Sequence, residues 1–63
     1  MGIRENLARA LKYEEELRRE YRWYAHYASR DPEVRQMFEE FAQDQDEHIQ
    51  ALKEKLREYP VKR

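Results

Sequence analysis

One short stretch, Ser29-Arg30-Asp31-Pro32, is the only break between two long runs of helix-forming residues, and it decides the fold. Asp31 is a favoured type of residue at a helix N-cap. Pro32 suits the first helical position because its fixed φ fits a helix and its missing N–H is not needed there. Pro60 marks the end of the second run. The sequence therefore predicts a single domain over residues 1–63, with a helix over about 3–29, a turn at about 29–31 and a helix over about 32–58.

Apolar residues recur at alternating steps of three and four in both runs, which is the spacing of one face of a helix. This stripe consists of Ile3, Leu7, Ala10, Leu17, Tyr21, Tyr24 and Ala28 in the first run and Val34, Phe38, Phe41, Leu52 and Leu56 in the second. Further apolar residues are expected to widen or flank it, namely Tyr13, Trp23, Tyr27, Met37, Ala42 and Ile49, whereas His26 is expected at the surface. Two such helices joined by a tight turn predict an all-α fold, an antiparallel two-helix hairpin.

The size of the chain argues that one hairpin does not suffice. A fold of about 60 residues buries only about 60% of the surface that its unfolded chain exposes. The chain has no cysteine, so no disulfide can compensate. A lone hairpin cannot cover both apolar stripes, but two hairpins packed together form a four-helix bundle that does. We therefore expect a homodimer or a higher homo-oligomer.

Composition excludes several other classes of function. With 13 Lys+Arg against 14 Asp+Glu, the formal net charge is -1, whereas nucleic-acid-binding proteins usually carry a basic excess. No apolar run approaches the roughly 18 residues that a membrane span requires, and the first residues lack the apolar stretch of a signal peptide. The sequence therefore predicts a cytoplasmic protein with no nucleic-acid partner and no membrane association.

Three polar residues stand where the stripe calls for core residues: Glu14, Gln45 and His48. Glu14 precedes Asp31 by as many residues as His48 follows it. An antiparallel hairpin therefore places Glu14 and His48 in the same layer, near the middle of both helices. A second hairpin would bring its own pair to a similar height. Carboxylates and imidazoles that meet in an apolar core form a ligand set for a divalent transition metal.

Each of these residues also has a simpler interpretation. Glu14 can form a surface ion pair with Arg18, one helical turn later. His48 can be a neutral core histidine hydrogen-bonded to Gln45, Tyr21 or Glu14. Gln45 can be a device that fixes helix register, as single buried polar residues do in coiled coils.

Two motifs resemble those of the rubrerythrin family. The segment Glu14-Glu15-Glu16-Leu17-Arg18-Arg19-Glu20-Tyr21 is similar to the Glu-x6-Tyr element of the first helix in that family. The segment from Met37 to His48 resembles its second helix, which ends in Glu-x-x-His. The resemblance spans nearly the whole chain but only half of the usual four-helix domain. As in the two-helix encapsulated ferritins, it implies a hairpin that dimerises into a ferritin-like four-helix bundle.

The resemblance also implies a chemistry. Rubrerythrin-like proteins bind a di-iron centre that reacts with dioxygen or peroxide, so a peroxidase or ferroxidase activity is implied. Glu14 matches the first-helix ligand and His48 the histidine ligand. Tyr21 matches the tyrosine beside them, which would hydrogen-bond a ligand or quench a radical. Asp44, four residues before His48, is a further candidate ligand.

Gln45 departs from the family pattern, which has glutamate at that position. Two copies with glutamate would offer four carboxylates, enough to offset two divalent ions, whereas two copies of this chain offer only the two Glu14 carboxylates. Iron in a di-iron site remains the metal that the resemblance implies, but the charge count favours a single Fe, Zn or Mn ion. The alternative is a metal-free structural or interaction hairpin with a degenerate site.

Overall fold

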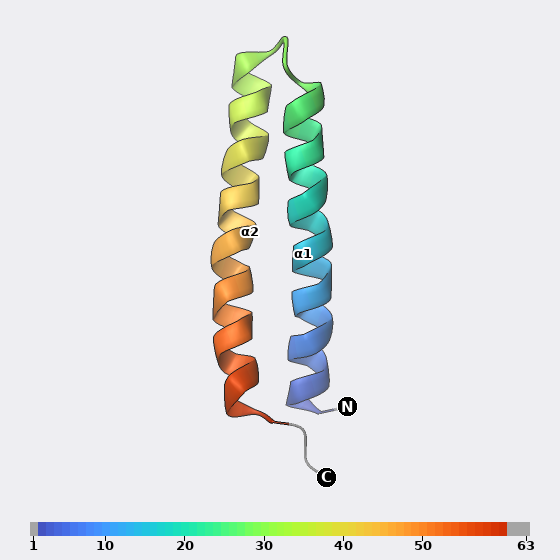
Figure 1. Ribbon diagram of the computed structural model, residues 1–63, viewed down its shortest axis with the longest axis vertical. Coiled ribbons are helices and arrows are strands. Elements are labelled where there is room, and N and C mark those ends of the chain that lie inside the picture. The colour runs from blue at the N-terminus through green and yellow to red at the C-terminus, as the bar shows by residue number, and fades with distance from the viewer. Residues whose placement is uncertain (1, 61–63) are drawn as a thin grey trace.

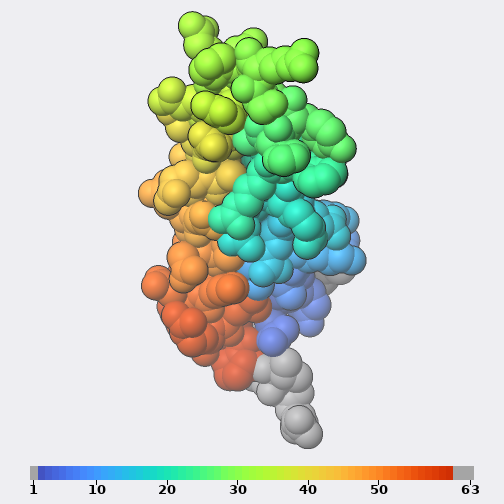
Figure 2. All heavy atoms as spheres, turned by 45° about the horizontal axis from the view of Figure 1, so that its top comes forward, coloured from blue at the N-terminus to red at the C-terminus, as the bar shows by residue number. Residues whose placement is uncertain are grey.

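The computed structural model describes residues 2–60, which form two antiparallel helices, α1 (Ile3–Tyr27) and α2 (Pro32–Glu58) (Figure 1). The helices contain 25 and 27 residues and lie side by side (Figure 2). The extents along the principal axes are 52 × 15 × 14 Å. The prediction of an all-α hairpin is confirmed. Within the described residues, no helix has an apolar stretch long enough to cross a membrane.

The turn between the helices is one residue longer than the sequence predicts, because it begins at Ala28. Helix α1 ends at Tyr27 rather than at about residue 29, and the N–H of Ala28 still bonds to the carbonyl of Tyr24 at 3.0 Å. The N–H of Asp31 then bonds to the carbonyl of Ala28 at 3.1 Å, which closes the turn. Asp31 is the N-cap of α2, as predicted, and its Oδ1 accepts a hydrogen bond from the N–H of Val34 at 3.2 Å. Such a cap contributes about 1 kcal/mol to helix stability.

The seam between α1 and α2 is narrow. Its fully buried apolar residues are Ala25, Ala42 and Ile49, with 4%, 3% and 1% of their surface exposed. Ala42 and Ile49 only flank the predicted stripe, and Ala25 lies outside it. Residues within the stripe, such as Leu17 and Leu52, are only half-buried. The two helices therefore meet along one edge of the stripe and leave its centre uncovered.

Large apolar side chains in the stripe and beside it consequently remain in contact with solvent. Tyr24, Met37 and Phe41 are 42%, 40% and 39% exposed. Tyr24 directly precedes the buried Ala25, and Phe41 directly precedes the buried Ala42, so each points about 100° away from the seam. Because the two helices are antiparallel, the side chains of Tyr24 and Phe41 point to the same side of the hairpin. We call this side the open face, and it comprises Leu17, Tyr24, Met37, Phe41, His48 and Leu52.

Candidate metal centre

Glu14, Gln45 and His48 come together near the middle of the hairpin. Glu14 projects from α1, and Gln45 and His48 project from α2, one helical turn apart. The Nε2 of Gln45 donates a hydrogen bond to Oε2 of Glu14, and Nδ1 of His48 lies 3.0 Å from the same oxygen. Because Glu14 and His48 are equally many residues away from Asp31, the antiparallel packing of the helices brings them into contact.

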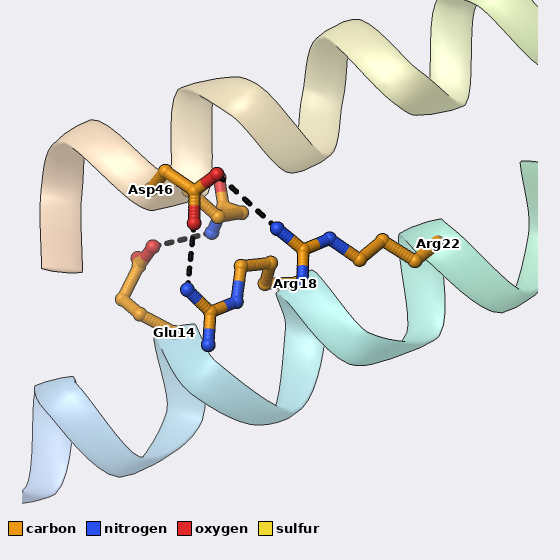
Figure 3. Close-up of polar contacts among 5 residues, drawn as sticks. Glu14, Arg18, Arg22 and Asp46 are labelled. Atoms are coloured by element: carbon orange, nitrogen blue, oxygen red, sulfur yellow. Dashed lines mark hydrogen bonds and ion pairs between the residues drawn. The ribbon is translucent and has the colours of Figure 1, made fainter.

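These three residues lie at different depths. Gln45 is only 8% exposed and occupies the floor of the site between the helices. The side chain of Glu14 is 26% exposed, and that of His48 is 58% exposed. Figure 3 shows Glu14 reaching from α1 across to α2. The buried amide is satisfied by the carboxylate, while the imidazole stands on the open face.

The two hydrogen bonds to Glu14 do not involve Oε1 of Glu14 or Nε2 of His48. They use Oε2 of Glu14 and Nδ1 of His48. The two ring nitrogens of an imidazole point in different directions, so one ion bound by both residues would take the place of the direct contact between Nδ1 and Glu14. The site therefore presents one carboxylate oxygen and one imidazole nitrogen at the open face.

The other two predicted site residues do not join this group. The ring of Tyr21 packs against Phe38 and Phe41, with centroid separations of 6.0 and 5.4 Å. Among residues 2–60, no hydrogen bond joins Tyr21 to Glu14 or His48. Asp44 is exposed, and it makes no ion pair or hydrogen bond with either of them in that range.

The donor set of one hairpin is too small for a metal centre. Over residues 2–60, no three histidine, aspartate or glutamate side chains gather closely enough to hold an ion. Two copies of Glu14 and His48 would supply four donors, the number in a tetrahedral site such as that of zinc. Their two carboxylates offset the charge of one divalent ion. By this charge count, the residues of two hairpins would suit one divalent ion better than a di-iron centre.

A separate ion cluster lies beside the site. Arg18 Nη1 is 2.6 Å from Oδ1 of Asp46, and Arg22 Nη2 is 3.4 Å from Oδ2 (Figure 3). The alternative pairing of Arg18 with Glu14 is therefore wrong. Sequence reasoning missed Asp46 because the register places both Asp44 and Asp46 near the level of Arg18. Which of the two aspartates pairs with Arg18 depends on the rotation of α2 about its axis, and that rotation turns Asp46 toward Arg18.

The Asp46 cluster predicts a pH dependence of stability. The hydrogen bond from Arg18 lowers the pKa of Asp46; partial burial opposes this shift, and the charges of Arg18 and Arg22 add to it. An aspartate whose folded-state pKa is lowered stabilises the fold above its unfolded-state pKa of about 3.9, and this contribution disappears as the pH falls through the folded-state pKa. Asp46→Asn should therefore lower the free energy of unfolding at pH 7 but not at pH values where the wild-type carboxylate is protonated.

Urea unfolding followed by circular dichroism, with a chelator present, measures this difference across the pH range. Asp44→Asn is the matched control, because the same change two residues away removes no ion pair within the described residues. A loss in Asp46→Asn that persisted unchanged into strong acid would show that the ion pairs are not its source.

Comparison with known proteins identifies the family. The family model described as Rubrerythrin matches residues 5–63. The match includes nearly all of α1, the whole of α2, and the three residues that meet at the site. No curated protein and no solved structure was found to match the chain. Because the family model covers almost the entire sequence, the chain belongs to the rubrerythrin family.

Proposed function

We propose that this chain is a metal-binding half-bundle, completed by a second copy of itself, in which Glu14 and His48 of both hairpins hold one divalent cation. The observation that carries the proposal is the contact between Glu14 and His48 at the open face. Membership of the rubrerythrin family favours iron, and zinc and manganese accept the same donors.

The open face supports the role of a second copy. Tyr24, Met37 and Phe41 expose about two-fifths of their surface along one side of the hairpin. Contiguous exposed apolar surface of this kind marks an interaction site. Each Å² of apolar surface removed from water contributes about 25 cal/mol to association. A second hairpin docked here would also cover His48 and bring the two pairs of donors together.

The residues of the site would have distinct roles in this assembly. Glu14 would supply negative charge, and His48 a neutral nitrogen ligand. The amide of Gln45 would hold Glu14 in place from below, because it donates to Oε2 and leaves Oε1 for the cation. Bound iron would supply the redox chemistry of ferrous-ion oxidation or of peroxide or dioxygen reduction. Tyr21, packed between phenylalanines, would seal the apolar core around the site.

A metal-free interaction hairpin is the second candidate, and Gln45 is the observation that favours it. Its buried amide already satisfies Glu14, so the polar group is complete without a cation. A buried polar contact of this kind can fix the register between helices. In that case Glu14→Leu would stabilise the assembly, because replacing a buried charged group by an apolar one is often stabilising.

Metal content per chain tests the proposal. Tag-free protein, purified without chelators and then incubated separately with ferrous iron and with zinc, is analysed by elemental mass spectrometry. We expect about half an ion per chain, since one tetrahedral site uses the donors of two hairpins. Glu14→Leu should abolish binding, whereas the control Glu54→Leu, on the exposed side of α2, should not. Unchanged metal content in Glu14→Leu would refute the proposal, and a blank result for the wild type would favour the metal-free hairpin.

A further inference from the structure

A second group of aromatic side chains stands on the surface of α1. Trp23 stacks on His26 with a centroid separation of 5.7 Å, and the ring of Tyr27 meets the edge of Trp23 at 4.9 Å. Trp23 is 57% exposed and Tyr27 is 69% exposed. We call Trp23, His26 and Tyr27 the back cluster. It has no part in the site described above.

The back cluster does not belong to the apolar stripe. Trp23 lies two residues before the buried Ala25 and Tyr27 two residues after it, and each step of two turns a side chain by about 200°. Both aromatic rings therefore point away from α2 and away from the open face. The prediction that Trp23 and Tyr27 widen the stripe is wrong. A partner on the open face would leave the back cluster in water.

Charges are arranged around Trp23 so that the surface complements itself. Consider two copies of α1 that pack antiparallel with their Trp23 residues in contact. A residue a given number of positions before Trp23 in one copy then faces the residue the same number of positions after Trp23 in the other. Glu20 then faces His26 of the other copy, and Arg19 faces Tyr27. Glu16 lies seven residues before Trp23, and Arg30, in the turn that follows α1, lies seven residues after it, so the two are at a similar height in this arrangement.

Each of these encounters is favourable. The guanidinium of Arg19 can lie over the ring of Tyr27 as a cation–π pair. Glu16 and Glu20 are like charges one turn apart, an arrangement that destabilises an isolated helix. Neither has an ion-pair partner within residues 2–60. Arg30 and His26 of a second copy would provide partners for both glutamates. A two-fold axis repeats every pair, as in all isologous interfaces.

We propose that the back cluster is a second self-association surface, through which α1 of one hairpin binds α1 of another in antiparallel orientation about Trp23. The surface is small, so the contact belongs to the weak class of interfaces. It is independent of metal and lies on a different side from the open face. A pair of hairpins joined through their open faces would carry two back clusters, so the second contact links such pairs into larger assemblies.

The test follows molecular mass and Trp23 fluorescence over a concentration series. Trp23 is the single tryptophan of the chain, so its emission reports on this surface alone. Light scattering should show a mass that rises above that of two chains at high concentration. The emission should shift to shorter wavelength over the same range, as Trp23 leaves water. Trp23 emission that stays unchanged over the whole concentration range would refute the proposal, whatever the mass of the open-face assembly.

Exchanging the charges of Glu16 and Arg30 tests whether the two copies of α1 pack antiparallel. Glu16→Arg and Arg30→Glu should each weaken the association about tenfold, because each turns two attractive pairs into repulsive ones. The double variant should restore it. Glu54→Arg, the same change on α2, should have no effect. The hairpin pair at the open face should survive in all four variants, which separates this test from that of the metal centre. Failure of the double variant to restore association would contradict the antiparallel contact.

Discussion

Replacing Ile49 by alanine is expected to remove about half of the free energy of unfolding. Ile49 is the one large side chain, among the described residues, that is fully buried, with 1% of its surface exposed. Truncating a buried isoleucine to alanine costs about 2–5 kcal/mol, because transfer energy is lost and a cavity remains. A chain of 63 residues has a total stability of about 3–9 kcal/mol. Urea unfolding monitored by helical circular dichroism measures the loss.

Ile3→Ala is the matched control for Ile49→Ala. The substitution is chemically identical, but Ile3 is 58% exposed at the beginning of α1. It should therefore cost less than half as much as Ile49→Ala. Equal losses for the two variants would mean that the seam between α1 and α2 is not the main source of stability. Both variants are compared at several protein concentrations, so that an effect on self-association can be separated from an effect on the hairpin.

The hairpin is predictable from the sequence because its signals are local. Asp31 and Pro32 specify where α2 begins through backbone chemistry that requires no knowledge of the rest of the fold. The apolar period identifies two helices for the same reason. The seam is less predictable, because the rotation of each helix depends on the sizes of side chains on both. Ala25 and Ala42 are small enough to bring the helices close, so the seam runs through them and not through the larger stripe residues.

The candidate site shows the same division. A single turn fixes the register of an antiparallel pair, so equal distances from Asp31 suffice to predict that Glu14 meets His48. The predicted position of Gln45 follows from its place one turn before His48. Arg18 could not be assigned in this way, because choosing between Asp44 and Asp46 requires the rotation of α2. Neither the second copy nor the cation is determined by these contacts, and both remain predictions.

Gln45→Glu should have opposite effects on the metal-free and the metal-bound protein. The amide of Gln45 is buried and donates to Glu14, and glutamate would replace this donor by a second carboxylate. A buried carboxylate beside Glu14 cannot donate this hydrogen bond and repels the charge of its neighbour. Loss of one partner in a buried hydrogen bond costs about 1–3 kcal/mol. The metal-free variant should therefore unfold at lower urea concentration than the wild type.

With metal present, the same substitution should strengthen binding. A pair of hairpins would then offer four carboxylates, so its capacity should rise from about one divalent ion to about two, and metal should stabilise the variant more than the wild type. Gln43→Glu adds the same charge at an exposed position of α2 and should change neither quantity. The two readouts are urea unfolding with a chelator and metal content after dialysis. If Gln45→Glu lost stability without binding more metal, Gln45 would be a structural residue only, because the added charge would then have no cation to neutralise it.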